Sequence, residues 1–185
     1  MGAGVIPYCK NGTETWFLFH TTFSGRREGF LVDFGGGGQA GESYRQTAVR
    51  EFIEETETQY FSEHPETARR DAASVAAQIP LVEALFDSTL TSRPQSWCRR
   101  EPGNKIPPKD WVSYFIEVPH RDLEPMNRAW AQDDGSRFKK RRELFWVPAA
   151  ELLDIYENAP LRLWKRVRQL QGAPELIRSI ALAQG

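Results

Sequence analysis

A cluster of glycines at residues 35–38 separates an apolar run from an amphipathic segment, and this arrangement limits the folds open to the chain. The run at 29–35, GFLVDFG, is typical of a buried strand. From Ser43 to Thr56 apolar residues recur at helical spacing, and the stripe consists of Ala48, Val49, Phe52 and Ile53. Because that stripe must pack against a sheet, the strand, glycine loop and helix predict an α/β or α+β fold.

Other segments agree with a mixed sheet covered by helices. The Asn11-Gly12 pair lies between two apolar or β-branched runs and predicts a β-hairpin formed by residues 4–10 and 15–22. Further strands are expected at 111–119 and 143–148. Helices are expected at 66–88, with an interruption at Pro80, and at 149–156, 159–170 and 174–183. Polar, Pro-rich or Gly-rich composition predicts loops at 91–110 and 121–137.

Composition limits the organisation and the partners of the chain. Its 185 residues, 40% of them hydrophobic, predict a single domain over 1–185 with a helical and loop insertion at about 59–109. With a formal net charge of -1, the chain does not have the overall positive charge of proteins that bind nucleic acids nonspecifically. Nucleic acid is therefore disfavoured as a partner. Cys9 and Cys98 are too few for a disulfide scaffold, and neither a signal-peptide pattern nor an apolar run of about 18 residues occurs. We therefore expect a cytoplasmic protein with reduced thiols and no membrane partner.

Three glutamates crowd the predicted helix that follows the glycines. Glu51, Glu54 and Glu55 lie within about 100° of one another, beside the apolar stripe. Like charges at these spacings cost about 0.2–0.5 kcal/mol per pair, and the helix dipole disfavours each anion in the C-terminal half by about 0.3–1 kcal/mol. Arg50 offsets part of this cost through its i, i+4 spacing to Glu54. The cluster therefore predicts a further counter-charge.

The spacing of these residues forms a motif. Read from Gly36 to Glu55, the sequence has the pattern G-x5-E-x7-R-E-U-x-E-E, where U is a bulky apolar residue. This pattern resembles the signature box of the Nudix hydrolase family, and the strand and helix of ELFWVPAAELL resemble the end of a Nudix sheet more loosely. The family box usually continues x-G-U, whereas Glu57 and Thr58 stand there in this chain. The departure concerns the helix exit, where glycine normally supplies a left-handed cap.

The resemblance implies a fold, a cofactor and a reaction. It implies an α/β/α sandwich with a mixed sheet and a loop-helix-loop box that binds Mg²⁺, with Mn²⁺ as an alternative. The implied reaction is hydrolysis of the diphosphate linkage in a nucleoside diphosphate derivative such as a nucleotide sugar, a dinucleotide or a nucleoside triphosphate. The implied metal ligands are the Gly36 carbonyl and the carboxylates of Glu51, Glu54 and Glu55, while Arg50 orients a glutamate. Clustered carboxylates suit this assignment because Mg²⁺ is a hard ion that prefers oxygen ligands.

Other residues are candidates for substrate binding and proton transfer. Arg26, Arg27 and Gly37 are expected to bind substrate phosphates, and the basic run 137–142 is a second candidate clamp; solvated loops are the alternative for both basic clusters. Glu42 either reaches the metal through water or is favoured by the helix dipole. The base that takes the proton of the attacking water is expected to be Glu51, with four candidates outside the box: Glu117, Asp133, Asp134 and Glu143.

Three competing interpretations differ in the function they assign. Residues 36–41 also read GxGxxG, the dinucleotide fingerprint, but the segment 56–71 that follows the helix is too polar for the second strand of a Rossmann unit. A catalytically silent nucleotide-binding module and an RNA decapping-type hydrolase both remain compatible with the motif. The sequence determines neither the leaving group of the reaction nor the oligomeric state.

Overall fold

The computed structural model describes residues 1–102 and 110–183, and its centre is a mixed β-sheet. The strand order is β4-β5-β1-β2-β6, with β3 paired to β1 off this path. β1 and β5 are parallel, whereas the other pairs are antiparallel. The strands are β1 (Gly2–Asn11), β2 (Glu14–Thr22), β3 (Phe34–Gly37), β4 (Trp97–Arg99), β5 (Trp111–Glu117) and β6 (Arg142–Pro148).

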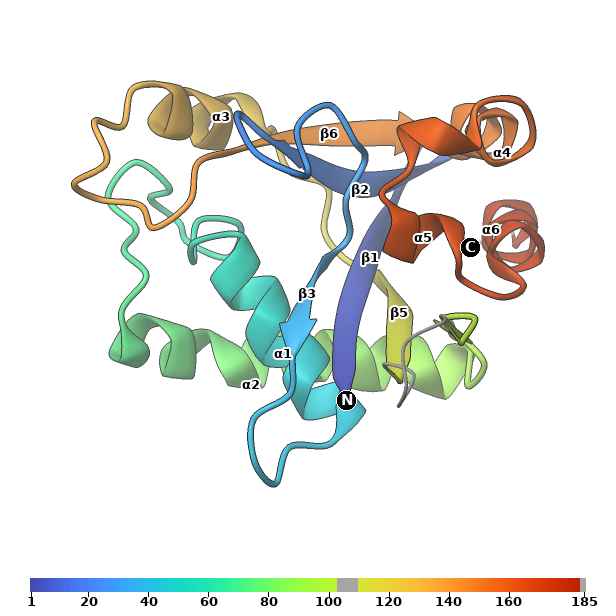
Figure 1. The fold of residues 1–185 in the computed structure, drawn as a ribbon. Helices are drawn as coiled ribbons and strands as arrows, with labels where there is room; N and C mark the ends of the chain where they lie inside the picture. The colour runs from blue at the N-terminus through green and yellow to red at the C-terminus, as the bar shows by residue number, and fades with distance from the viewer. Residues whose placement is uncertain (103–109, 184–185) are drawn as a thin grey trace.

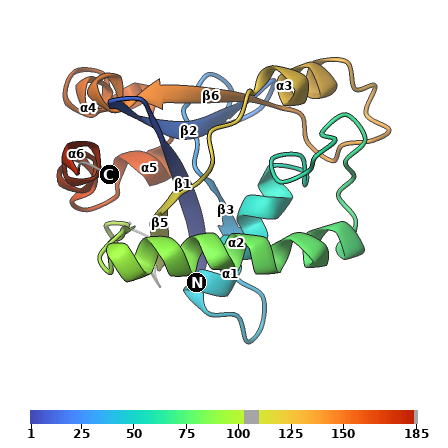
Figure 2. The same ribbon diagram turned by 180° about the vertical axis from the view of Figure 1, so that it is seen from behind.

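Helices cover both faces of this sheet. Figures 1 and 2 show α1 (Tyr44–Glu55) and α2 (Ala72–Ser92) together on one side, while α4 (Ala149–Asn158), α5 (Lys165–Arg168) and α6 (Ala173–Leu182) gather on the other. Alternate residues of β2 feed the two cores: Leu18 packs in the core of α1 and α2, while Phe17 and Phe19 pack in the core of α4 and α6. The predicted α/β fold with a mixed sheet between two helical layers is confirmed.

The first hairpin forms as predicted. β1 and β2 pair antiparallel from Tyr8 opposite Phe17 to Asn11 opposite Glu14, and Gly12 takes a positive φ of 62° in the turn. The expected strands at 111–119 and 143–148 are β5 and β6. In β5 the residues are buried nearly throughout, which explains its continuous apolar run.

Helix α1 carries the glutamates and begins with a capping box. The Ser43 hydroxyl accepts a hydrogen bond from the Gln46 amide, and the Gln46 side chain accepts one from the Ser43 amide. Ser43, rather than Glu42, is therefore the N-cap. The predicted apolar stripe is confirmed, because its four residues are at most 1% exposed.

Helix α2 differs from its prediction. It begins at Ala72, where Asp71 caps it, and it continues through Pro80 to Ser92 without interruption. Pro80 is exposed, so water can satisfy the backbone groups that the proline ring leaves without partners. Burial of Val82 and Phe86 anchors the second half of the helix and outweighs the local cost.

Both predicted loops contain regular structure. The loop expected at 91–110 contributes the end of α2 and strand β4, which extends the sheet beside β5; residues 103–109 lie outside the described residues. The connection expected at 121–137 contains α3 (Glu124–Ala131). Because its composition is polar, α3 was not predicted. Met126 and Trp130 are both fully buried, and their spacing of four residues places them on one face of the helix.

Two other elements also shift from their expected positions. Residues 159–170 do not form one helix, because the short 3₁₀ turn Pro160–Arg162 ends at Leu163, whose backbone pairs with Leu31 before α5 begins. The strand expected at 29–35 is β3, which begins only at Phe34 and runs into the glycines. For residues 159–170, packing of the buried Leu163 overrides the helical periodicity of the sequence.

Two expectations about environment can be compared with the described residues. Both cysteines, Cys9 and Cys98, are buried and unpaired, as expected for free thiols. No helix in the described ranges combines the length and apolar character that crossing a bilayer requires.

Candidate active site

The glycines of the motif form a strand rather than a loop. Gly35 pairs with Gly4 in the β1–β3 ladder, and a Cβ on Gly35 would lie 2.5 Å from the carbonyl oxygen of Ala3. None of residues 35–38 has a positive φ. Their small size therefore permits close packing of β3 against β1.

Gly36 brings the backbone against the first glutamate of the cluster. A Cβ on Gly36 would lie 2.4 Å from the carboxylate of Glu51, so that carboxylate rests directly on the Gly36 main chain. Two of the proposed metal ligands thus lie side by side although they come from β3 and α1.

Arg50 connects the helix α1 to the strand β3 and to the loop between them. Its Nε and Nη2 donate to the two oxygens of Glu42 at 2.7 and 3.0 Å, and its Nη1 donates to Glu51 at 2.8 Å. Nη2 also donates to the carbonyl oxygen of Gly37 at 2.9 Å. Bonds to both carboxylates fix the guanidinium plane, so Arg50 holds the Glu51 side chain in one orientation.

Glu42 is held by the protein itself. Besides Arg50, its carboxylate accepts hydrogen bonds from the Gln39 amide and the Thr47 hydroxyl at 2.8 and 3.1 Å. The Arg50 hydrogen bonds, together with these further donors, outweigh the opposing effect of burial and lower the pKa of Glu42 to about 2. In the structure the Glu42 carboxylate is therefore charged, and it links the loop before α1 to the helix.

The other two glutamates also meet cations. Arg70 donates to Glu54 Oε2 at 2.7 Å, and Arg50 lies 3.4 Å from the same oxygen. Arg142, which is 0% exposed, donates to Glu55 Oε2 at 2.5 Å. Around Glu55 there are two further cations at 3.7 Å, Arg27 and Lys140.

These contacts change the electrostatic argument made from the sequence. The repulsion among the glutamates does not require an external cation, because the folded chain supplies Arg50, Arg70 and Arg142. Burial alone would raise the pKa of Glu55, but Arg142 and the neighbouring cations outweigh burial and lower it to about 2. Burial raises the pKa of Glu51 despite its bond to Arg50. The two buried carboxylates therefore differ in proton affinity.

Three residues of this ion network were missed by sequence reasoning. Arg70 lies in a segment without regular structure, and Arg142 was predicted only within the basic run 137–142, as part of a phosphate clamp or a solvated loop and not as a partner of Glu55. His20 on β2 is 0% exposed, and its Nε2 lies 3.8 Å from Glu55. Burial, followed by the charge of Arg142, lowers the pKa of His20 to about 3, so the imidazole is neutral at neutral pH. Only the pairing of β2 with β6, which places Thr22 opposite Arg142, could have indicated these neighbours.

The exit from α1 keeps the left-handed geometry without a glycine. Glu57 and Thr58 have φ values of 51° and 63°, and such a conformation costs an L-residue about 1–2 kcal/mol. Glu57 is fully buried, with its carboxylate 3.5 Å from Arg70 and 3.9 Å from Arg142. The departure from the family pattern thus adds a fifth carboxylate, after Glu42 and the three helix glutamates, to the ion network, and burial raises the pKa of Glu57.

The donor set can be compared with the needs of a divalent ion. In the described residues no three Asp, Glu, His or Cys side chains are placed so that they could hold an ion together. Glu51, Glu54 and Glu55 nevertheless each keep one carboxylate oxygen that accepts no hydrogen bond from the described residues, namely Glu51 Oε2, Glu54 Oε1 and Glu55 Oε1. The donor chemistry therefore fits a hard cation, although the described side chains do not converge on one point as they stand.

Two cavities flank the carboxylates. One, of about 320 Å³, is lined by Glu54, Arg50 and Arg70, and the other, of about 490 Å³, is lined by Arg27, Lys140 and Arg142 among others. Lys139 lines both. The predicted substrate residues Arg26 and Arg27 lie in the second cavity, whereas Gly37 is not among the residues that line either cavity.

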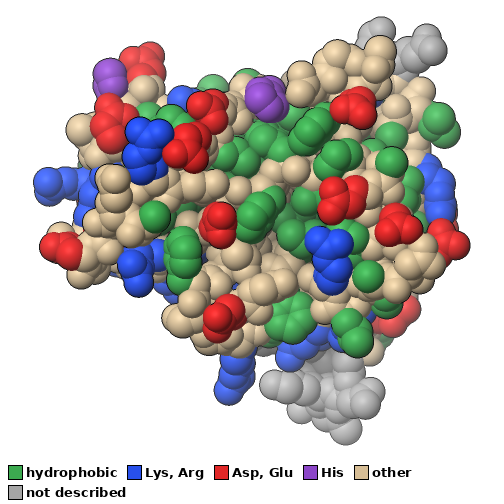
Figure 3. Space-filling model, turned by 90° about the horizontal axis from the view of Figure 1, so that it is seen from above, with side chains coloured by type: hydrophobic (Ala, Val, Ile, Leu, Met, Phe, Trp, Pro, Cys, Tyr) green, Lys and Arg blue, Asp and Glu red, His purple; other side chains and the backbone are tan. Residues whose placement is uncertain are grey.

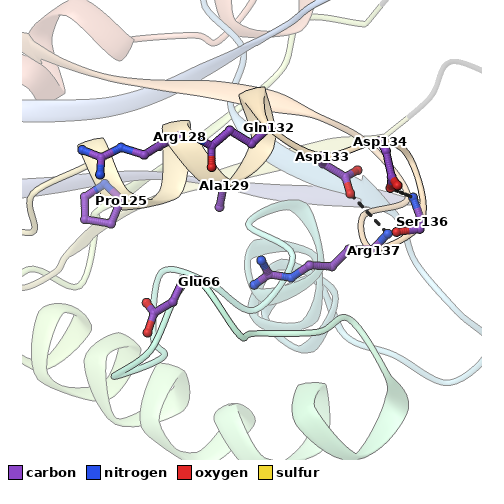
Figure 4. A pocket seen from close by; sticks show the side chains of 9 residues that line it. All are labelled: Glu66, Pro125, Arg128, Ala129, Gln132, Asp133, Asp134, Ser136 and Arg137. Atoms are coloured by element: carbon purple, nitrogen blue, oxygen red, sulfur yellow. Dashed lines mark hydrogen bonds between the residues drawn. The ribbon is translucent and has the colours of Figure 1, made fainter.

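The general-base candidates outside the box are placed elsewhere. Asp133 and Asp134 line a separate cavity of about 580 Å³, where their side chains accept hydrogen bonds from the amides of Arg137 and Ser136 (Figure 4). Glu117 accepts a hydrogen bond from the Tyr8 hydroxyl at the end of β5, and Glu143 stands opposite Thr21. None of the four makes a hydrogen bond or ion pair with the box glutamates among the described residues.

The surface above the β6 edge shows mixed charge. In Figure 3, which looks down on the side where α3, β6 and α4 lie uppermost in Figure 1, acidic and basic side chains are interspersed with apolar ones. This face therefore lacks the continuous basic stripe that a nucleic-acid backbone requires.

The shifted carboxylates predict how stability depends on pH. The pKa of Glu42 and Glu55 is about 2 in the folded chain against an ordinary 4.5, so their stabilisation is complete above about pH 4.5 and is lost as the pH falls toward 2. Glu51 and Glu57 have raised pKa values, and their contribution has the opposite sign because it is lost as the pH rises. We expect the free energy of unfolding, measured with urea at stepped pH, to fall between pH 4.5 and 2.

Two variants check the origin of that dependence. Glu42→Gln is expected to flatten the decline because it removes one carboxylate with a lowered pKa. Glu157→Gln on α4 is the control, since Glu157 is exposed and outside the network. Equal slopes for Glu42→Gln and the control would contradict the assignment.

Comparisons with known proteins give distant similarities. Neither the protein-family models nor the curated proteins contain a match to this sequence. Among solved structures, the chain is similar to an Ap4A hydrolase of C. elegans in a binary complex, with 13% identity, a TM-score of 0.45, and coverage of 98% of this chain and 96% of that one. It is also similar to the Nudix hydrolase RenU of M. smegmatis, with 14% identity, a TM-score of 0.47, and coverage of 98% and 88%. A NUDIX hydrolase of Alicyclobacillus acidocaldarius gives 12% identity, a TM-score of 0.42, and coverage of 98% and 90%.

Proposed function

We propose that this chain is a Nudix-type hydrolase that uses Mg²⁺, with Mn²⁺ as an alternative, to cleave the diphosphate linkage of a nucleoside diphosphate derivative. One observation carries the proposal: residues that are separated in the motif meet in space as one unit. Glu51 rests on Gly36, and Arg50 joins Glu51 to Glu42 and to Gly37. A solvated acidic helix face, the simplest alternative, would not bury Glu51 or tie it to the glycine strand.

The residues that would hold the ion are the Gly36 carbonyl and the carboxylates of Glu51, Glu54 and Glu55. When bound, a divalent ion supplies Lewis-acid polarisation of a phosphoryl oxygen and lowers the pKa of a coordinated water. The chain contributes orientation, since Arg50 fixes Glu51, and it contributes positive charge beside the leaving phosphate through Arg27 and Lys140. Glu51 remains our candidate for the base, because its pKa is raised by burial.

A second candidate function, a silent nucleotide-binding module, gains support from the ion network. Each box glutamate has an arginine partner within 3 Å, so the cluster is electrostatically satisfied without an ion. Repulsion among the glutamates, which favours a metal-binding enzyme when the sequence is considered alone, therefore no longer argues against a silent module. A decapping-type hydrolase remains a third candidate, distinguished by its RNA substrate.

Turnover with and without metal separates these candidates. We expect that one or more compounds in a panel of nucleotide sugars, dinucleotides and nucleoside triphosphates are hydrolysed with Mg²⁺, that EDTA abolishes turnover, and that added Mg²⁺ restores it. Phosphate analysis of the products identifies the cleaved bond. Binding of a panel compound without turnover in either Mg²⁺ or Mn²⁺ would favour the silent module, and turnover confined to capped RNA would favour the third candidate.

A further inference from the structure

The cavity beside Glu55 collects cations from two distant segments of the chain. Its lining contains six cationic side chains and no acidic one: Arg26, Arg27, Lys139, Lys140, Arg141 and Arg142. The first two come from the turn after β2, and the other four lead into β6, whose first residue pairs with the end of β2. The two basic clusters that the sequence presents separately thus form one site.

Negative charge within the protein does not balance this cavity. Arg27, Lys140 and Arg142 all face Glu55, and among the described residues only Arg142 has a second carboxylate in reach, that of Glu57 at 3.9 Å. The other three, Arg26, Lys139 and Arg141, have no carboxylate within 4.0 Å in the described parts of the chain. Two charges about 4 Å apart repel by about 1 kcal/mol even in water and by more near a protein surface, so the cluster favours an anionic occupant.

One of the residues that line the cavity, Arg142, carries a donor without a partner in the described part of the chain. Arg142 is 0% exposed, and its Nε has no hydrogen-bond partner among the described residues. A buried guanidinium N–H without an acceptor is costly, at about 1–3 kcal/mol or more for a charged group. An oxygen of a bound anion would remove that cost.

We propose that this cavity binds a chain of phosphate groups, so that the substrate carries more phosphates than the diphosphate that is cleaved. A phosphate group carries about -1.5 to -2 charges at pH 7, so about two to three groups balance the excess of the six cations over Glu55 and Glu57. A neutral sugar or a single nucleoside would leave the cations unmatched. The proposal rests on the proposed function only for the identity of the cleaved bond, because anion binding requires the cavity alone.

The shape of the site favours a small ligand over a nucleic acid. A volume of about 490 Å³ lies within the range of small-molecule pockets. The six cations surround this one cavity, whereas a nucleic-acid backbone needs a basic track along the surface. The favoured class is therefore a small polyphosphorylated molecule.

Binding of inorganic tripolyphosphate without divalent metal tests the proposal independently of hydrolysis. By calorimetry at fixed salt, tripolyphosphate is expected to bind at least about 100-fold more tightly than orthophosphate, because it engages several cations at once. Lys139→Ala/Arg141→Ala is expected to weaken tripolyphosphate binding about tenfold or more. Both residues are exposed, so the fold is retained, and an unchanged thermal midpoint verifies this.

A charge-matched control keeps the test specific. Arg128→Ala/Arg178→Ala removes two exposed cations from other helices, and it is expected to change the affinity less than twofold. Equal affinities for the two phosphate compounds, or equal losses in the two double variants, would overturn the proposal. Stronger binding of an RNA oligonucleotide of equal charge would overturn the small-molecule class. If the chain binds tripolyphosphate tightly but hydrolyses none of the panel compounds, the proposed anion site is supported and the proposed function is refuted.

Discussion

Glu54→Gln is expected to lower the rate of Mg²⁺-dependent hydrolysis by about 100- to 1000-fold, because a carboxylate ligand contributes several kcal/mol through the ion it holds. Of the three helix glutamates, Glu54 is the most suitable for testing the role of a metal ligand. Its Oε1 accepts no hydrogen bond from the described residues, and it lines the cavity of about 320 Å³ beside Arg50. Glutamine keeps the size of the side chain and an oxygen that can accept from Arg70.

Stability should change little in the same variant. Glu54 is partly exposed, with 19% of its side-chain surface accessible, so loss of its charge leaves Arg70 near water and near Glu57. The measurements are single-turnover rates at saturating Mg²⁺ and the thermal unfolding midpoint. Glu157→Gln on α4 is the matched control and should retain both. Turnover of Glu54→Gln within threefold of the parent would remove Glu54 from the site.

The residues of α1 show how far the sequence determines this site. The spacing of Glu51, Glu54 and Glu55 and the stripe through Phe52 depend only on helix periodicity, so both were predictable. The hairpin was predictable because Asn11-Gly12 selects a tight turn locally. The mixed sheet followed from the order of such elements, with its helical layers supplied by the family resemblance.

The partners of the glutamates could not be predicted in the same way. Arg142 reaches Glu55 only because β6 pairs with β2 on the far side of the sheet from β5, and nothing local in the run 137–142 distinguishes this arginine from its solvated neighbours. The helix α3 and the strand β4 were missed for a related reason. Their burial depends on tertiary contacts, and their composition is polar.

The Glu55–Arg142 pair yields the largest expected effect on stability. Arg142→Met is expected to lower the free energy of unfolding by about 3–5 kcal/mol, because it leaves a buried carboxylate without its closest partner. Glu55 is 6% exposed in its side chain, and Arg27 and Lys140 lie farther away, at 3.7 Å. Urea unfolding at pH 7 measures the loss. Arg178→Met, at an exposed position on α6, should cost less than about 1 kcal/mol.

The double variant Glu55→Gln/Arg142→Met distinguishes the ion pair from general packing. With both charges removed, no unpaired ion remains at this position, so the double variant is expected to be more stable than Arg142→Met alone. Arg142 also lies 3.9 Å from Glu57, whose pKa burial already raises, so Glu57 can take up a proton when its cation is lost. If the two single losses add in the double variant, the residues act independently, and the network around Glu55 does not hold the end of α1 as described.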